Sequence, residues 1–385
     1  MKFGSDEIHI KNPKEFISKM VKIVEDNDRK AIVWSPGLEA DKSVIRQTWG
    51  SNPNLNPDGI EEIDSQRSYI NGGEPMSFIN TLLFKPIGSE SHNKVLGGII
   101  CLWPDVNLND ENDAFIQNPA YPALLTYAWS TWTADITSAP DSYLVNPPTN
   151  NAEAARYFKH YENFLIDHKD RYFSKEPFPY VAQSDKQWHV IGPFNGNDGD
   201  DILKIDASHY SYNGKDIKWQ KASGNTLVIK ARWLNNGYFP EIKPDQCAYA
   251  MTYIYSDEQK QVPSWINFET PLRANRVYSG LPDNGKWDAN GGIIYLNDKE
   301  LPGPQWQNPN WKPSKQKGWG SAEDQEIPWS KEELYWTRQP FLLTLNKGWN
   351  KIVVKIPYTN DFQNCTFTFI PLDMEGLKFS VDQSK

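Results

Sequence analysis

The sequence predicts an α/β region followed by an all-β region, and three observations lead to this fold class. Up to about residue 175, short apolar runs alternate with stretches of helical periodicity, as in parallel strands joined by helices. After Pro177-Phe178-Pro179 the runs become short and alternating, with turn residues such as Asn297-Asp298 between them. With 385 residues, of which 38% are hydrophobic and 23% charged, the chain can build one to three domains with substantial cores. We therefore expect an α/β domain over 1–175 and a β-sandwich or jelly roll over 187–385.

The helices of the first region are predicted from capping signals and from apolar periodicity. Asn12 offers an N-cap, Pro13 suits the first helical position, and Glu15 places a carboxylate in the first turn. Apolar residues at helical spacing follow them. The same kind of periodicity gives the full set of expected helices: 13–28, 75–85, 122–133 and 152–169.

Short apolar runs predict the strands. In the first region each run ends near Trp, Tyr or Asn and is followed by a loop rich in Pro and Gly, which is typical of buried parallel strands. These runs are 31–34, 44–49, 68–71 and 95–103. In the second region the alternating runs are 188–194, 226–233, 247–255, 291–297, 341–345, 350–356 and 366–370.

Composition excludes several kinds of partner. The formal net charge of −9 argues against nucleic acid, because nucleic-acid-binding proteins concentrate Lys and Arg on one face. The longest uncharged run, 114–134, carries prolines and several hydroxyl groups and makes a poor membrane span. The first residues reach acidic side chains before any apolar stretch develops, so we expect no signal peptide there.

The cysteines and histidines indicate no metal site. Cys101, Cys247 and Cys365 are odd in number and widely spaced, which fits neither a disulfide framework nor a zinc site. The six histidines are scattered, with no pair at ligand spacing. We expect no metal and no cofactor.

Aromatic and polar side chains recur at the carboxyl ends of the predicted parallel strands. They are Trp34, Trp49, Tyr69, Asn71, Trp103 and Asp105. In a β/α barrel these ends face the mouth, where the side chains would form an aromatic cup with a carboxylate at its edge. Such a cup suits a sugar, whose C–H faces stack on rings and whose hydroxyls bind carboxylates and amides. Packing between barrel and helices is the alternative interpretation for Trp34 and Trp49.

Two adjacent carboxylates, Asp6 and Glu7, follow the apolar start of the chain and precede the first predicted helix. Neighbouring residues of a strand point to opposite sides, so two carboxylates at a strand end can serve different roles. The alternative interpretation is a solvated pair in a loop.

Together these motifs resemble family 20 of the glycoside hydrolases, the β-N-acetylhexosaminidases. The resemblance covers about residues 1–135 and is carried by Gly4-Ser5-Asp6-Glu7, Trp34, Gln47-Thr48-Trp49, Tyr69-Ile70-Asn71, Gly97-Gly98 and Leu102-Trp103-Pro104-Asp105. They match the second half of the catalytic (β/α)8 TIM barrel, strands four to eight. The β-rich second region is similar to jelly-roll, galactose-binding-like accessory modules, through Trp287 to Lys299 and Leu345 to Lys355.

The resemblance implies a role for each residue at the predicted site. Glu7 would be the general acid/base. Asp6 would orient the substrate's own 2-acetamido group, whose carbonyl oxygen attacks the anomeric carbon, and Tyr69 would donate a hydrogen bond to that oxygen. The substrate-binding residues would be Trp34, Trp49 and Trp103 around the sugar, with Asn71 and Asp105 on its outer hydroxyls.

The sequence departs from the family pattern in three ways. Lys2 stands where the family has His, and Asp105 stands where it has the longer Glu. Only five of the eight barrel strands can be found, so we expect that an N-terminal half-barrel polypeptide completes the fold. The other expected partner is an oligosaccharide or glycoconjugate, and the resemblance implies an extracellular or periplasmic location.

Two alternatives to the hydrolase stay open. The chain could be a non-catalytic glycan-binding or scaffold protein with a degenerate half barrel, or a hydrolase of another barrel family. Six tryptophans, Trp287, Trp306, Trp311, Trp319, Trp329 and Trp336, lie within 50 residues of the second region. They suit either a stacking surface for glycan or the small core of a long loop.

Overall fold

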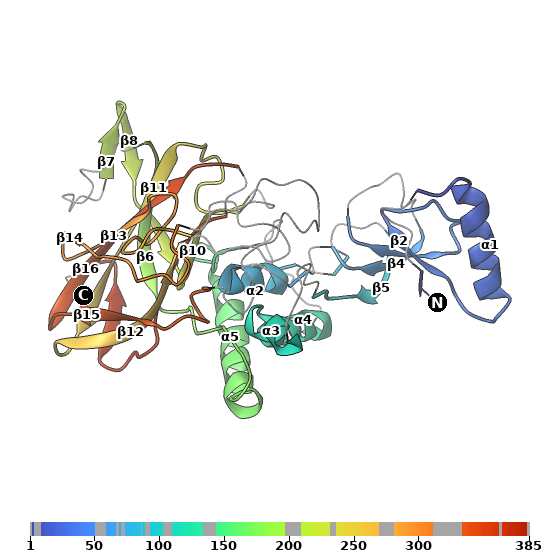
Figure 1. The fold of residues 1–385 in the computed structure, drawn as a ribbon, viewed down its shortest axis with the longest axis horizontal. Helices are drawn as coiled ribbons and strands as arrows, with labels where there is room; N and C mark the ends of the chain where they lie inside the picture. The colour runs from blue at the N-terminus through green and yellow to red at the C-terminus, as the bar shows by residue number, and fades with distance from the viewer. Residues whose placement is uncertain are drawn as a thin grey trace. The chain divides into compact units, whose positions relative to one another are not determined.

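The chain folds into an α/β part and a larger β-rich part, as Figure 1 shows for a computed structural model of the protein. The structure describes residues 2–3, 9–50, 59–66, 69–70, 74–85, 87–88, 93–102, 110–133, 144–196, 209–231, 236–268, 281–310, 333–361 and 364–382. Two compact units can be distinguished. The first comprises Met1–Ile70, Leu82–Trp103 and Ala123–Thr137, and the second Asn71–Thr81, Pro104–Pro122 and Ser138–Lys385. The domain limits expected at 175 and 187 stay a prediction.

A five-stranded sheet forms the first unit, and its strands lie side by side in chain order. The strands are β1 (Lys2–Phe3), β2 (Ile32–Ser35), β3 (Ile45–Thr48), β4 (Glu61–Asp64) and β5 (Lys94–Gly98). Every neighbouring pair is parallel, which confirms the parallel arrangement expected from the apolar runs.

The prediction of a strand over 68–71 is wrong. The strand that pairs with both neighbours is Glu61–Asp64, and Tyr69 makes only an isolated parallel bridge to Cys101. Sequence patterns miss β4 because it begins with two glutamates. Glu62 is buried and accepts a 3.0 Å hydrogen bond from Asn93, while Glu61 pairs with two lysines at the surface.

Helix α1 (Pro13–Glu25) covers one face of this sheet (Figure 1). It begins at Pro13 as expected and ends three residues earlier than expected, at Glu25. Its apolar side packs through Ile17, Val21 and Val24 onto a cluster that includes Val33 of β2. Because side chains alternate along a strand, the neighbouring Trp34 belongs to the opposite face of the sheet.

The remaining helices confirm the expected positions and add one short helix. They are α2 (Pro75–Leu83), α3 (Glu111–Ile116), α4 (Ala120–Thr133) and α5 (Ala152–Tyr172). The side chain of Asn151 caps α5 by accepting hydrogen bonds from two backbone amides of its first turn. Buried Glu162 holds α5 to the chain that follows it, accepting hydrogen bonds from the Tyr180 hydroxyl at 3.2 Å and the Ser184 amide at 3.1 Å.

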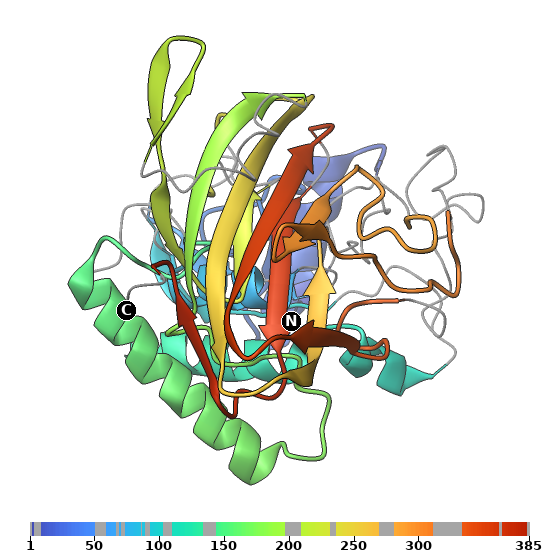
Figure 2. The same ribbon diagram turned by 90° about the vertical axis from the view of Figure 1, so that its left-hand side faces the viewer.

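Two antiparallel sheets make up most of the second unit (Figure 2). The four-stranded sheet has the order β10-β17-β12-β15, and the seven-stranded sheet has the order β14-β13-β16-β11-β6-β9, with β18 beside β11. A separate hairpin joins β7 and β8. The strands are β6 (Gln187–Asn195), β7 (His209–Tyr212), β8 (Lys215–Lys218), β9 (Gln220–Ser223), β10 (Thr226–Lys230), β11 (Gln246–Ser256), β12 (Lys260–Asn267), β13 (Ile293–Leu296), β14 (Lys299–Glu300), β15 (Phe341–Leu345), β16 (Gly348–Tyr358), β17 (Cys365–Pro371) and β18 (Leu377–Ser380).

All seven strands expected in the second region are present, and six further strands were not expected. Strand β12 escapes prediction because Pro263 interrupts its pattern, although the residue pairs with Leu342 of β15. The others are short or polar.

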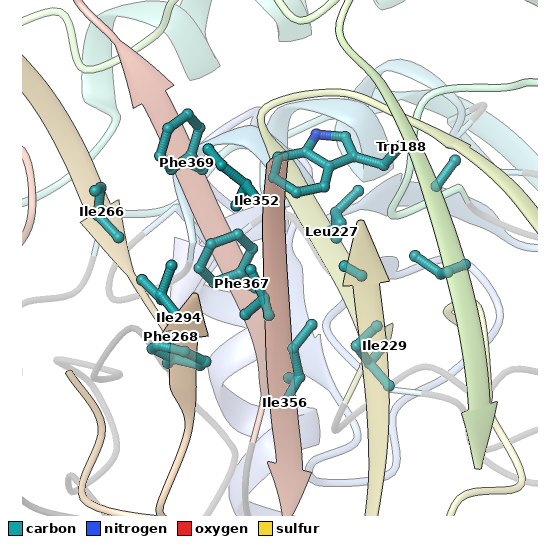
Figure 3. Close-up of a cluster of buried hydrophobic side chains, with 14 of the residues drawn as sticks. Trp188, Leu227, Ile229, Ile266, Phe268, Ile294, Ile352, Ile356, Phe367 and Phe369 are labelled. Carbon is teal, nitrogen blue, oxygen red and sulfur yellow. The ribbon is translucent and has the colours of Figure 1, made fainter. Parts of the chain in front are cut away.

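The two sheets share one core (Figure 3). Trp188 of β6 lies with its ring edge toward Phe367 and Phe369 of β17, at centroid distances of 5.8 and 6.0 Å. Its indole nitrogen donates to the carbonyl of Gly224 at 3.1 Å, so the buried polar atom is satisfied. The mixed α/β plus β-rich fold class is therefore confirmed. Among the helices within the described ranges, none has both the length and the apolar character to cross a membrane.

Truncating a ring of this core should destabilise the second unit strongly. Phe367 is 0% exposed, and we expect Phe367→Ala to lower the free energy of unfolding by about 3–5 kcal/mol, because it leaves a cavity between the sheets. The control is Trp132→Ala, at a ring that is 91% exposed, which should change stability by no more than about 0.5 kcal/mol. Urea unfolding followed by circular dichroism measures both. Equal losses in the two variants would contradict the assignment of the core.

Candidate functional site

Three of the predicted site residues, Trp34, Trp49 and Tyr69, lie within the described part of the chain. The others lie outside the described residues: Asp6, Glu7, Asn71, Trp103 and Asp105. For these five residues the assigned roles stay predictions.

The three described residues lie toward or beyond the carboxyl ends of neighbouring parallel strands. Trp34 is in β2, Trp49 directly follows β3, and Tyr69 follows β4 and bridges to Cys101 beyond β5. Since the strands are parallel and adjacent, these positions belong to one edge of the sheet. That edge is where open parallel sheets and β/α barrels place binding groups.

Hydrogen bonds fix the aromatic residues at this edge. The indole nitrogen of Trp49 donates to the carbonyl of Pro36 at 2.9 Å, and its backbone amide donates to the carbonyl of Ser35 at 2.8 Å. The amide next to Tyr69, that of Ile70, donates to the carbonyl of Cys101 at 2.8 Å. Trp49 is therefore attached through its ring and its backbone to the end of β2, and the backbone next to Tyr69 is attached to Cys101 beyond β5.

The sheet face that carries Trp34 is only partly covered. Ile32 and Trp34 of β2 and Ile63 of β4 are each half-buried, whereas Val33 on the opposite face is fully buried under α1. Register places Trp34 beside Gln47, and Gln47 beside Ile63. The face opposite α1 is thus an apolar surface with a partly exposed tryptophan at its carboxyl end.

Gln47 is a candidate binding residue. The sequence predicted no role for it and showed it only as part of the motif Gln47-Thr48-Trp49. Its side chain is 1% exposed and its amide nitrogen donates to the Ser65 hydroxyl at 3.3 Å. Its side-chain carbonyl oxygen is buried and has no hydrogen-bond partner among the described residues. Buried acceptors are normally satisfied, so this oxygen is an exception within the described residues.

A buried ionic group on the α1 side of the sheet was not predicted. Asp64, at the end of β4, accepts hydrogen bonds from the amides of Gln66 and Gly88 at 2.9 and 2.7 Å and lies 3.6 Å from the Lys85 ammonium. Burial, with the negative charge of Asp64, raises the pKa of the Tyr127 hydroxyl well above its ordinary value. The Tyr127 hydroxyl occupies the space that a Cβ atom at position 98 would need. Packing therefore explains why the second residue of Gly97-Gly98 is glycine. These partners give the group a structural role.

Glu74 is a second buried carboxyl that the sequence did not reveal. One of its oxygens accepts hydrogen bonds from the hydroxyls of Thr226 at 3.1 Å and Thr368 at 3.3 Å, and also from the Tyr335 hydroxyl. The other oxygen accepts from the Ser77 amide in the first turn of α2 at 3.0 Å. Glu74 therefore joins the start of α2 to strands β10 and β17 within the second unit.

Two of the clustered tryptophans are packing residues. Trp287 and Trp306 are buried, and their indole nitrogens donate to the carbonyls of Leu301 at 2.8 Å and Lys286 at 2.9 Å. The packing interpretation is confirmed for these two. Trp336 is half-buried, and its indole nitrogen donates to the carbonyl of Ile116 at 2.8 Å. Three others, Trp311, Trp319 and Trp329, lie outside the described residues.

Within the described ranges, no group of three or more His, Cys, Asp or Glu side chains could hold a metal ion. The three cysteines are free and buried.

Comparison with known proteins adds no family to this description. No family model matches the chain, and no curated protein matches its sequence. The resemblance to the β-N-acetylhexosaminidases therefore stays a prediction, and the activity below is a proposal.

The buried Glu74 carboxyl should make stability depend on pH. Burial raises the pKa of Glu74 above its ordinary value, and hydrogen bonds from Tyr335, Ser77 and Thr226 only partly oppose that shift. Between the pKa of an unfolded glutamate, about 4.3, and the higher folded pKa, the folded state binds more protons. The free energy of unfolding should therefore fall as pH rises through this interval, and Glu74→Gln should remove that part of the slope.

Urea unfolding at a series of pH values measures the effect. Glu39→Gln, at a side chain that is 66% exposed, is the matched control and should keep the slope of the natural protein. Identical slopes for Glu74→Gln and the natural protein would show that Glu74 does not titrate in this way.

Proposed function

We propose that the chain is the carboxyl-terminal part of a glycoside hydrolase that releases terminal β-linked N-acetylhexosamine by substrate-assisted, retaining catalysis. In this proposal the first unit supplies strands four to eight of a (β/α)8 TIM barrel. The antiparallel sheets form a jelly-roll, galactose-binding-like accessory module.

The observation that carries the proposal is the edge of the five-stranded sheet. Five parallel strands lie in chain order, and Trp34, Trp49 and Tyr69 lie toward or beyond the ends of three that are neighbours. Consecutive parallel strands in this order are what a segment of such a barrel contains. Aromatic rings with a phenol hydroxyl at that edge suit a sugar carrying an amide.

The proposed reaction needs two carboxyl groups with different tasks. Glu7 protonates the glycosidic oxygen, and the bond from that oxygen to the anomeric carbon breaks. The substrate's acetamido carbonyl oxygen forms a new bond to the same carbon, so no nucleophile of the protein is required. Asp6 orients the acetamido nitrogen, and Tyr69 donates a hydrogen bond to the acetamido oxygen. Water, deprotonated by Glu7, then opens the intermediate.

Binding residues surround this chemistry. Trp34, Trp49 and Trp103 enclose the sugar ring and the acetamido methyl, and indole rings close to Glu7 would raise the pKa of its carboxyl so that it holds a proton near neutral pH. Asn71 and Asp105 bind outer hydroxyls. The substrate is a terminal N-acetylglucosamine or N-acetylgalactosamine of an oligosaccharide or glycoconjugate, and the proposed setting is extracellular or periplasmic.

The half-covered sheet supports a further polypeptide partner. Parallel sheets are normally buried on both faces, and Ile32, Trp34 and Ile63 leave one face of this sheet partly exposed. An N-terminal half-barrel polypeptide would cover that face and pair with the outer strands β1 and β5. We propose that activity requires this partner.

Replacing the proposed acid tests the function. In the protein together with the segment that completes its barrel, Glu7→Gln should lower hydrolysis of an aryl N-acetyl-β-glucosaminide by about 10²-fold or more, because the leaving oxygen is no longer protonated. Glu39→Gln, at an exposed glutamate of the same unit, should leave the rate unchanged.

Activity of Glu7→Gln above a few per cent would contradict the proposal. The competing function is a non-catalytic glycan-binding or scaffold protein, favoured by a second unit whose core is complete by itself. It predicts oligosaccharide binding without hydrolysis in the natural protein and in both variants.

A further inference from the structure

The seven-stranded sheet has a second face, directed away from the core. Along β11, Ala248, Ala250 and Ile254 point into the core shared with the other sheet. The residues between them, Tyr249, Met251 and Tyr253, belong to a separate cluster on the opposite side. We call this side the outer face, and its strands run side by side in Figure 2.

Aromatic rings are concentrated on the outer face. They are His189, Phe194, Trp219, Tyr249, Tyr253, Tyr255, Tyr295 and Trp349. Two pairs are in contact: Tyr255 and Trp349 meet edge to face at 5.4 Å, and His189 and Trp219 lie 6.2 Å apart at 35°. These four rings are all half-buried, so they keep surface for a ligand.

Exposure increases along the outer face from one end of β11 to the other. The hairpin of β7 and β8 packs onto Phe194 through Tyr210 and Tyr212. Near this end Tyr249 is 1% exposed, while Tyr253 is 5% exposed and Tyr255 only half-buried. The accessible pair Tyr255 and Trp349 therefore lies away from the hairpin, whereas Trp219 directly follows β8.

Lysines stand between the rings, and they outnumber the acidic residues there. Outward positions of β6, β9, β11, β13, β16 and β18 carry Lys221, Lys351, Lys355 and Lys378 together with His189, and within these described strands no Asp or Glu occupies such a position. The chain as a whole has a net charge of −9, so this face is an exception to its composition. Three acidic groups of the described residues lie close to these cations: Asp298 is 3.5 Å from the Lys351 ammonium, Glu300 of β14 stands opposite Tyr295 and pairs with Lys286 at 3.3 Å, and the charge of Asp382 acts on His189.

We propose that the outer face binds an anionic polysaccharide, one whose sugar units carry carboxylate or sulfate groups. Half-buried rings can stack on the C–H faces of sugar units, and the ammonium groups beside them can pair with the anionic substituents. This site goes beyond the proposed hydrolase activity and does not depend on it, because the second unit has its own core and all the residues involved.

The number of cations favours a glycan over nucleic acid. Lys355 is buried and Lys351 is ion-paired, so Lys221 and Lys378 are the two exposed lysines of the outer face within the described strands. Nucleic acid places a charge at every phosphate, and proteins that bind it neutralise many of them. A polysaccharide with spaced charges needs fewer cations and more ring contact.

Titration calorimetry of the whole chain tests the proposal with four hexasaccharides. We expect binding of a heparin-derived and a galacturonate hexasaccharide, weaker at high salt, and no comparable binding of the neutral cellulose and mannan hexasaccharides. The two anionic probes distinguish sulfate from carboxylate. Binding of one or both supports the proposal.

Two variants locate the site. The double variant Lys221→Gln/Lys378→Gln alters only exposed side chains and should weaken binding roughly tenfold, since it removes two exposed ion pairs with the ligand. Trp349→Ala should weaken it through loss of stacking. Lys175→Gln and Trp132→Ala, at an exposed lysine and an exposed tryptophan that do not belong to this face, should bind as the natural protein does.

A readout at His189 separates binding from loss of fold. Burial and the charge of Lys221 hold the pKa of His189 below its ordinary value, and a bound anion should raise that pKa in an NMR titration. No binding of either anionic probe would overturn the proposal. Equal binding of the neutral probes, retention of full affinity by the double lysine variant, or binding of oligothymidylate in place of the glycans would also overturn it.

Discussion

A parallel sheet requires cover on both of its faces, and the described part of the first unit meets this requirement fully on one face and only partly on the other. On one side α1 buries Val33 and its neighbours, and Asp64 is satisfied by Lys85 and two amides. On the other side Ile32, Trp34 and Ile63 stay half-exposed. The same face leads to the edge where Trp34, Trp49 and Tyr69 lie. The completing strands that we propose and the proposed active site therefore both follow from this partly covered face.

The antiparallel sheets of the second unit depend on no such partner. Each covers the other, with Trp188 and Phe367 in contact between them and the Trp188 indole nitrogen satisfied by the Gly224 carbonyl. The outer face of the seven-stranded sheet is consequently free to differ in composition from the core. Its rings and lysines suit a ligand, whereas the buried Trp287 and Trp306 serve packing. These tryptophans of the second unit thus fall into two groups: buried ones that pack, and half-buried ones on the outer face that suit a ligand.

Local signals predicted the helices and most strands, and long-range contacts account for what was missed. Asn12 with Pro13 marks the start of α1, and apolar periodicity gave the other long helices. Strand β4 was missed because Glu62 is buried by pairing with Asn93, 31 residues away. Glu74 was missed because its partners at 226, 335 and 368 are more than 150 residues distant, and no local pattern encodes them. At the site, strand ends predicted Trp34, Trp49 and Tyr69, but only register reveals that Gln47 stands beside Trp34.

The central claim is that the substrate's acetamido group takes part in the reaction at the edge of the parallel sheet. The most direct measurement compares the hydrolysis rates of an aryl N-acetyl-β-glucosaminide and the matching aryl β-glucoside, in the protein together with the segment that completes its barrel. Substrate assistance predicts turnover of the first and almost none of the second, because the hydroxyl at that position cannot replace the acetamido oxygen. Comparable rates for the two substrates would contradict the account.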